Sequence, residues 1–227
     1  MIRAAVIGRG RVGSALIRAW ETSEVRLAEP AEADILVICV PDDAIGEVSG
    51  RFAGRAMAHV CGAHPASILR GDGPKIAIHP LQTVTMDEPA DVFQGVRFSV
   101  EGDEVLRDAA HRLVRAAGGV PMDVSPEQKR ALHVAAVILS NFTVGLHAAA
   151  DDVLAKSGIP ATSDTLLRPL LDRTLANIRR MGAQASLTGP AARGDQATIA
   201  AHAAAITDER VRNLYLAMSG YLRGWSS

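Results

Sequence analysis

The sequence contains few aromatic residues and few cysteines. Only 4% of its 227 residues are Phe, Trp or Tyr, although 48% are hydrophobic, so we expect a core built from Ala, Val, Leu and Ile. The two cysteines, Cys39 and Cys61, each lie in an apolar run that is typical of a strand. This placement favours buried free thiols of a cytoplasmic protein over a disulfide or a redox pair.

The sequence also lacks an excess of charge of either sign. Its 24 basic and 25 acidic residues give a net charge of −1, which excludes the strongly basic surface of a nucleic-acid-binding protein and a polybasic membrane patch. The seven histidines form no cluster with carboxylates or cysteines at the spacing of metal ligands, so no metal site is predicted. We expect a small-molecule substrate as the partner, and neither nucleic acid nor a membrane.

Charge is missing altogether from residues 131–150, a stretch long enough to span a bilayer. It contains His133, Asn141 and His147, which are costly in lipid, so we predict the buried central helix of a bundle instead. The N-terminus reaches Gly8 without the longer apolar stretch of a signal peptide. Both observations favour a cytoplasmic location.

Apolar runs alternate with helical patterns through the first half of the chain. The runs that predict strands are residues 1–8, 25–27, 35–40, 58–61, 75–78 and 96–100, and residues 11–23 predict a helix. This alternation indicates an α/β fold with a Rossmann-type, doubly wound parallel sheet.

The pattern changes after residues 118–121. Ser125 and Pro126 are a typical helix start, and most of the remaining chain is rich in alanine and leucine at helical spacing. We therefore predict a Rossmann-type domain over residues 1–124 and an all-helical domain over residues 125–227. The charge-free helix exposes more apolar surface than the rest of the helical domain could readily cover, which predicts a homodimer through that domain.

A glycine-rich turn, Gly8-x-Gly10-x-x-Gly13, follows the first strand and opens the first helix. In the dinucleotide-binding fingerprint the first glycine permits the tight turn, the second lets the backbone approach the pyrophosphate, and the third lets helix and strand pack closely. The alternative is a glycine turn that only packs a helix. The predicted cofactor-binding residues of this turn are Gly8, Arg9, Gly10, Arg11, Val12 and Gly13.

The segment after the second predicted strand is short. Glu29 lies 21 residues after Gly8, close to where an acidic residue holds the ribose hydroxyls, but it could equally be a solvated loop residue. Only about six residues separate the second strand from the third, whereas a parallel crossover usually needs a dozen or so. The adenosine side of the pocket is therefore predicted to be shortened, which leaves the choice between NAD and NADP open.

Several segments together resemble a known group of proteins. They are GRGRVGSAL (8–16), ICVPDDAI (38–45), IHPLQTVT (78–85), RFSVEGD (97–103), ALHVAAVILSNF (131–142) and TGPAARGD (188–195). The chain resembles the Rossmann-like dehydrogenases that carry a C-terminal domain of unknown function, in the superfamily of 6-phosphogluconate dehydrogenase, ketopantoate reductase and pyrroline-5-carboxylate reductase. The resemblance covers nearly the whole chain and implies NAD or NADP as the cofactor.

The same resemblance implies where ligands lie at the sheet edge. Val40 and Pro41 would lie beside the bound dinucleotide, while a purely structural role is that Pro41 ends the strand and Asp42 caps the next helix. His79 and Gln82 follow the fifth strand, where substrates sit in open α/β sheets. His79 could bind substrate or the nicotinamide amide, or it could simply satisfy loop carbonyls.

The first helix of the second domain carries polar residues on an apolar background. One face of it is formed by residues that recur at spacings of three and four, namely Lys129, His133, Val137, Ser140, Val144 and His147, and Asn141 flanks this face. In the superfamily a Lys and an Asn on this helix point at the substrate, which makes Lys129, His133 and Asn141 catalytic candidates and Ser140 a substrate contact. The alternative is that these groups hydrogen-bond inside a helical core.

Arg193 lies in a glycine-containing turn between two predicted helices. Its guanidinium could bind a substrate carboxylate, or it could pair with Asp195 and cap the next helix.

Together these patterns predict an NAD(P)-dependent oxidoreductase acting on a small keto, imino or hydroxy acid in the cleft between the domains. Two alternatives remain: a non-catalytic dinucleotide or metabolite sensor, suggested by the shortened adenosine pocket, and a helical dimerisation or interaction module.

Overall fold

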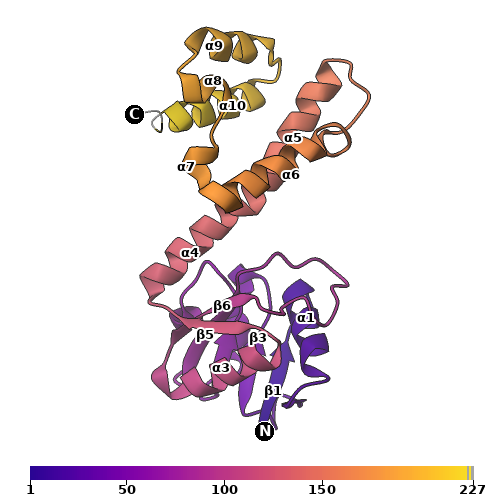
Figure 1. Ribbon diagram of the computed structural model, residues 1–227. Coiled ribbons are helices and arrows are strands. Elements are labelled where there is room, and N and C mark those ends of the chain that lie inside the picture. Colours follow the sequence, from indigo (N-terminus) through magenta and orange to yellow (C-terminus); the bar gives the residue numbers. More distant parts are fainter. Residues whose placement is uncertain (224, 226–227) are drawn as a thin grey trace. The chain divides into compact units, whose positions relative to one another are not determined.

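The chain forms two compact units in the computed structural model, which describes residues 1–223 and 225 (Figure 1). The first unit is Met1–Ser140 and the second is Asn141–Ser227. The predicted boundary at residue 124 follows a change in composition, whereas the division by contacts falls after Ser140. The helix that begins at Pro126 therefore belongs, by its contacts, to the first unit.

A seven-stranded sheet forms the centre of the first unit. Its spatial order is β2-β1-β3-β4-β5-β6-β7. The strands are β1 (Ile2–Ile7), β2 (Val25–Leu27), β3 (Ile35–Ile38), β4 (Met57–His59), β5 (Lys75–Pro80), β6 (Arg97–Gly102) and β7 (Val120–Asp123). The predicted Rossmann-type sheet and its first six strands are confirmed.

The sheet departs from the prediction at its far end. β5 and β6 are antiparallel, while the other neighbouring pairs are parallel. β7 is an edge strand that sequence analysis does not predict, because Pro121 lies inside it and proline is tolerated in a sheet mainly at edges. The sheet is thus parallel-dominated rather than wholly parallel.

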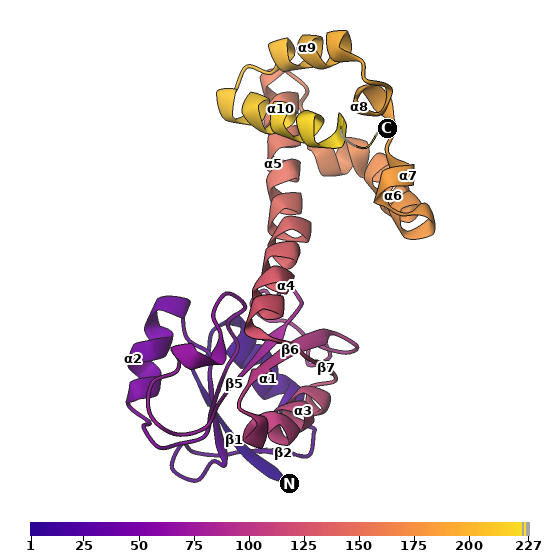
Figure 2. The same ribbon diagram turned by 90° about the vertical axis from the view of Figure 1, so that its left-hand side faces the viewer.

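Helices cover both faces of the sheet, so each strand alternates its apolar side chains between two cores. Helices α1 (Arg11–Trp20) and α3 (Arg107–Ala116) pack on one face, and α2 (Ile45–Gly50) packs on the other (Figure 2). The Trp20 indole N–H donates to the Leu113 carbonyl at 3.0 Å, which joins α1 to α3. Cys39 and Cys61 are buried free thiols, as predicted.

The register of β1 explains how so short a segment connects β2 to β3. The two strands flank β1 on opposite sides, with Leu27 opposite Ala4 at the end of β2 and Ile35 also opposite Ala4 at the start of β3. Residues 28–34 therefore only cross β1, a distance of roughly 10 Å, which a few extended residues span. No return along the sheet is needed, so the usual crossover helix can be absent.

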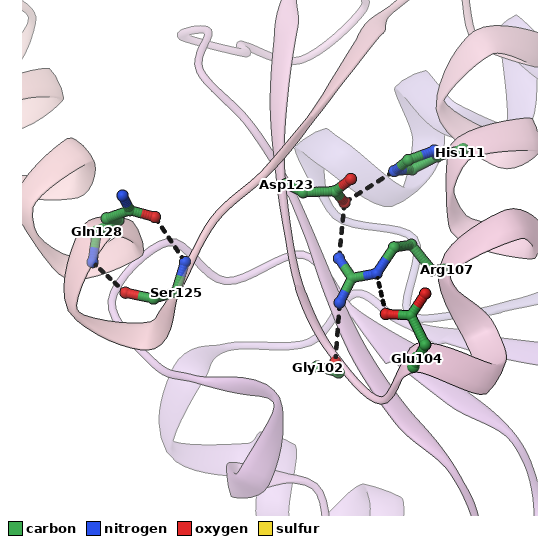
Figure 3. A network of polar contacts seen from close by, with 7 residues as sticks. All are labelled: Gly102, Glu104, Arg107, His111, Asp123, Ser125 and Gln128. Atoms are coloured by element: carbon green, nitrogen blue, oxygen red, sulfur yellow. Dashed lines mark hydrogen bonds and ion pairs between the residues drawn. The ribbon is translucent and has the colours of Figure 1, made fainter.

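Helix α4 (Pro126–Leu139) begins with a capping box in which Ser125 Oγ accepts from Gln128 N and the Gln128 side chain accepts from Ser125 N. Beside it, Arg107 and His111 of α3 both contact the Asp123 carboxylate at the end of β7, at 2.7 and 2.8 Å (Figure 3). These contacts fix the point at which the chain leaves the sheet.

The second unit is helical, as predicted. Its helices are α5 (Asn141–Lys156), α6 (Ser163–Met181), α7 (Ala183–Ser186), α8 (Gly189–Arg193), α9 (Gln196–Ala205) and α10 (Glu209–Arg223). The Arg193 turn of the prediction is the short helix α8, and Asp195 caps α9 by accepting from Thr198 N.

The prediction of a buried central helix is wrong for the isolated chain. Residues Pro126–Lys156 form a helical stretch that is long and apolar enough, by length and composition, to cross a membrane, and its most apolar window is not buried by the chain itself. The stretch is also interrupted, since α4 ends at Leu139 and α5 begins at Asn141. Val134, Ile138 and Phe142 are each at least half exposed.

Candidate functional site

The candidate site lies at the carboxyl edge of the parallel strands. β1, β3, β4 and β5 are neighbours and run parallel, so the residues that follow or end them meet at one edge: Gly8, Pro41, Cys61 and His79. Adjacent strands are about 4.8 Å apart, which puts β5 roughly 14 Å from β1. Ligands of open α/β sheets bind at this edge.

Each glycine of the turn after β1 has a distinct steric reason. Gly8 has φ +106°, and a Cβ there would lie 2.5 Å from the Cys39 carbonyl oxygen. A Cβ on Gly13 would lie 2.2 Å from the Gly8 carbonyl oxygen, so only glycine lets α1 pack this closely. Gly10 has an ordinary φ of −73° and nothing within 4 Å of the Cβ position. The fold does not need Gly10; it leaves open space at the start of α1.

The same space is suited to an anion. Gly10 caps α1 without a side-chain hydrogen bond, and the first turn of the helix has no acidic residue. Arg9 and Arg11 are exposed on either side of Gly10. Amide N–H groups at a helix N-terminus, with the helix dipole, attract phosphate. The turn therefore fits a dinucleotide pyrophosphate.

The other predicted cofactor contacts lie beside this turn. Val40 follows β3, and its Cγ1 would be 3.1 Å from a Cβ on Gly8, while Val12 packs on the core from α1. Pro41 is exposed and precedes a short 3-10 helix, Asp42–Ala44, that has no side-chain cap. The Asp42 side chain therefore does not cap this helix, which was the purely structural role considered for it.

Lys129 joins α4 to the turn after β4. Its ammonium donates to the carbonyl oxygens of Cys61 at 2.5 Å and Gly62 at 2.9 Å, and the residue is 2% exposed. Burial lowers the pKa of Lys129, while the charges of Cys61, Glu101 and Asp42 oppose this shift. An ammonium has three N–H donors, and Lys129 uses two of them to hold the turn after β4.

Two imidazoles meet above Gly62. The rings of His79 and His133 are edge to face, with centroids 5.6 Å apart. A Cβ on Gly62 would lie 2.3 Å from Nδ1 of His133 and 2.6 Å from Nε2 of His79, so both nitrogens point to the same spot. Nδ1 of His133 is buried and has no hydrogen-bond partner within the described residues. An unpartnered buried nitrogen is a place for a ligand or a water.

Hydrogen bonds set the form of the His79 ring. His79 Nδ1 lies 2.8 Å from the Val60 carbonyl oxygen, which only accepts, so Nδ1 carries the proton and Nε2 the lone pair. Burial lowers the pKa of His79 to about 4, and the Val60 contact opposes this only in part. The imidazole is neutral at pH 7, and Nε2 can accept a proton.

A third histidine, which sequence analysis did not single out, builds the turn itself. His59 is fully buried; Nε2 donates to the Pro65 carbonyl at 3.1 Å, and Nδ1 accepts from Cys61 N at 3.1 Å. The turn 61–65 is thus held at both ends by one ring. The signal in the sequence is position: this turn directly follows the predicted strand at residues 58–61, as His79 follows the next one.

The fold brings together a cysteine, a carboxylate and a histidine that show no ligand-like spacing in the sequence. Asp42, Cys61 and His64 come together with their possible ligand atoms all within 4.8 Å of one another. They follow two different strands, so their spacing along the chain does not indicate the cluster.

The remaining predicted site residues are Gln82, Ser140, Asn141 and Arg193. Gln82 is exposed and its side chain accepts from Thr83 N. Ser140 is the C-cap of α4, and its N–H donates to the Ala136 carbonyl. Asn141 and Arg193 are exposed residues of the second unit.

His147 also belongs to the second unit and lies 3.4 Å from Ser163 Oγ. The polar face predicted from Lys129 to His147 is therefore divided between the two units. Within the first unit, Lys129 and His133 of that face join His79 at the sheet edge.

Solved structures with the same fold were found across nearly the whole chain. A proposed NADP oxidoreductase of Bacteroides fragilis has a TM-score of 0.78 at 24% identity, covering 98% of each chain. A Thermotoga maritima protein has a TM-score of 0.76 at 24% identity, covering 99% of this chain and 98% of that one. An imine reductase of Myxococcus stipitatus in complex with NADP+ has a TM-score of 0.64 at 18% identity, covering 99% and 93%. At these identities the similarity concerns the fold.

No curated protein matches the chain. The model of one protein family does match it, over residues 96–222, and this family is described as a domain of unknown function, DUF2520. The match takes in the end of the sheet, α4 with Lys129 and His133, and nearly all of the second unit. Because it spans more than half of the chain, the protein belongs to the DUF2520 family.

Proposed function

We propose that this protein is an NAD(P)-dependent oxidoreductase that acts on a small keto, imino or hydroxy acid. The observation that carries the proposal is the open space at Gly10. Gly8 and Gly13 are explained by packing within the chain, but Gly10 is not, since a Cβ there would touch nothing. A glycine with open space at the N-terminus of a helix that follows the first strand is what lets a pyrophosphate approach the backbone.

The similar structures support the same class of cofactor. The Myxococcus stipitatus imine reductase has NADP+ bound, and a variant of that enzyme has NAD+ bound. Both dinucleotides are therefore candidates for this chain. Arg9 and Arg11 supply positive charge at the pyrophosphate position for either one.

The chain's own residues would bind the cofactor and manage a proton. A bound nicotinamide supplies the hydride chemistry. The start of α1 would hold the pyrophosphate, and Nε2 of His79 would accept a proton from a substrate hydroxyl or amine, since it is the unprotonated nitrogen of a neutral ring. Lys129 would act as a positioning residue that keeps Gly62 beneath the two imidazoles.

A dinucleotide or metabolite sensor is the second candidate. It is favoured by the length of β2, which ends opposite Ala4 although β1 continues to Ile7. The strand that would present an acidic residue to the adenosine ribose therefore stops short of the glycine turn, and Glu29 is exposed beyond it. A sensor would bind the dinucleotide without turning over a substrate.

Titration calorimetry with NAD+, NADH, NADP+ and NADPH tests cofactor binding. We expect saturable binding of at least one dinucleotide by the wild type and a loss of affinity of about a hundredfold or more in Gly10→Val, because the added side chain fills the space for the pyrophosphate. Gly50→Val is the matched control: a Cβ at Gly50 would meet only Arg70 side-chain atoms at 3.8 Å, at the end of α2. No binding by the wild type, or unchanged affinity in Gly10→Val, would refute the proposal.

A second measurement separates enzyme from sensor. Reduced or oxidised cofactor is followed by absorbance with panels of 2-keto acids, 2-hydroxy acids and cyclic imines. Turnover that is lost in His79→Phe, with dinucleotide affinity retained, supports the enzyme. Tight dinucleotide binding without turnover of any of these classes supports the sensor.

A further inference from the structure

Asp42, Cys61 and His64 form a cluster at the sheet edge that the proposed function does not use. Asp42 follows β3, whereas Cys61 and His64 belong to the turn after β4, and their possible ligand atoms lie within 4.8 Å of one another. Asp42 is exposed and Cys61 is buried, so the cluster is reached from solvent on the Asp42 side. Thiolate, carboxylate and imidazole are each ligands that bind zinc in proteins.

The turn that carries two of these groups is rigid. His59 binds it at Cys61 N and at the Pro65 carbonyl, Lys129 binds the carbonyls of Cys61 and Gly62, and Glu101 accepts from Ala66 N at 2.8 Å. A ligand turn held on every side keeps its geometry without a metal. Such outer contacts are what orient ligands in metal sites.

The Cys61 thiol holds its proton in the absence of a metal. Burial, followed by the contact with the Asp42 carboxylate, raises the pKa of Cys61 to about 11, and the backbone of His64 and Ala63 opposes this shift only in part. A metal ion bound here would displace that proton, because a coordinating thiol is deprotonated.

We propose that Asp42, Cys61 and His64 bind a zinc ion, with a water as the fourth ligand. In tetrahedral zinc sites the ligand atoms lie about 3.3–3.6 Å apart, so the three atoms need to close by about 1 Å, which side-chain rotation of Asp42 and His64 supplies. The thiolate and the carboxylate neutralise the charge of the ion. Three protein ligands and one open position are the arrangement of catalytic rather than structural zinc sites.

Lys129 is the group that works against a cation here. Its ammonium is near enough to interact with the charges of Cys61 and Asp42. It is, however, bound to two carbonyl oxygens, and burial already disfavours its charged form. The attraction between a doubly charged ion and its two anionic ligands exceeds the repulsion between that ion and the one ammonium at the edge of the cluster.

Cobalt and zinc binding to the metal-free full-length protein test the proposal. With Co2+ we expect one equivalent to bind and to produce the near-ultraviolet thiolate-to-cobalt charge-transfer absorption together with the visible bands of tetrahedral cobalt. Zn2+ should displace it. Cys61→Ser should abolish the charge-transfer band, and Asp42→Asn and His64→Gln should each weaken Zn2+ binding by about tenfold or more.

Cys39→Ser is the matched control, because Cys39 is also a buried free thiol; it should bind cobalt like the wild type. His111→Gln is the second control, since His111 also contacts a carboxylate, that of Asp123. Circular dichroism establishes that each variant is folded. No thiolate band in the wild type, or equal metal affinity in wild type and Cys61→Ser, would overturn the proposal. Dinucleotide binding is measured separately, so this failure is distinct from failure of the proposed oxidoreductase.

Discussion

Two buried histidines at the sheet edge differ from ordinary surface histidines in their protonation. Burial lowers the pKa of both His59 and His79 from 6.5 to about 4. His59 is the more completely enclosed, with no exposed surface, and both its nitrogens are used inside the turn. Protonation of this ring would break its contact with Cys61 N, because Nδ1 could no longer accept.

The free energy of unfolding should therefore fall as the pH is lowered from 6.5 to 4. In this window the unfolded chain takes up a proton at His59 and the folded chain does not, so stability present at neutral pH is lost toward pH 4. A shift of this size corresponds to roughly 3 kcal/mol for His59. Urea unfolding at pH 7 and pH 4 measures it, and His59→Gln, which cannot titrate, should lose less than the wild type by about that amount. Equal losses in the two proteins would contradict the prediction.

Sequence analysis identified part of the site at this scale. His79 was predicted from its place after a strand, and Lys129 and His133 from helical spacing, and these three residues do come together around Gly62. Gly62 was missed because a glycine carries no functional group. Its role becomes apparent only when the side chains that lie where its Cβ would be are known.

The cluster of Asp42, Cys61 and His64 was missed for a related reason. Its members are joined by the pairing of β3 with β4, and strand order cannot be read from spacing along the chain. The same limit applies to any site assembled from the ends of several strands.

At the scale of elements, periodicity predicted the strands well and their directions less well. The apolar runs that became β1, β3, β4 and β5 look alike, and so does β6. Nothing in the residues of a short strand tells whether it runs parallel or antiparallel to its neighbour. The short segment after β2 was recognised, but its geometry depends on which residues of β1 each neighbour pairs with.

The start of α4 offers a test at this scale. Ser125→Ala removes the acceptor for Gln128 N and should cost about 1 kcal/mol of folding stability, as N-cap substitutions usually do. The capping box also fixes the helix that carries Lys129 and His133. Thermal or urea unfolding measures the loss, with Ser157→Ala, just beyond the end of α5, as the control. A stability equal to the wild type would show that the cap is not needed.

At the scale of the whole molecule, the main feature is apolar surface that the chain does not cover. Val134 and Ile138 of α4 are 54% and 50% exposed, and Phe142 and Val144 of α5 are 57% and 69% exposed. Exposed apolar side chains of this kind mark an interface. A second copy is favoured over a membrane as the occupant, because Lys129 and His133, in the first half of this stretch, are engaged with the first unit.

We therefore predict a homodimer in which a second copy covers this surface. Light scattering at micromolar concentration should give twice the 23.9 kDa of one chain, and Ile138→Glu with Phe142→Glu should reduce the mass to that of a monomer. Val105→Glu is the control, since Val105 is 75% exposed on the first unit and should leave the dimer intact. A monomeric wild type, or flotation of the protein with lipid vesicles, would contradict this prediction.

The connection between β2 and β3 also has a consequence for redesign. Its two ends lie at the same height on the sheet, on either side of β1, and Glu29, Ala31 and Glu32 between them are exposed. A whole helix–strand unit could be grafted at this point, extending the sheet beyond β2 while the opposite end of β1 and its glycine turn stay in place. Such an insertion would leave the residues around Gly62 unchanged, because it lies on the far side of β1 from β4 and β5.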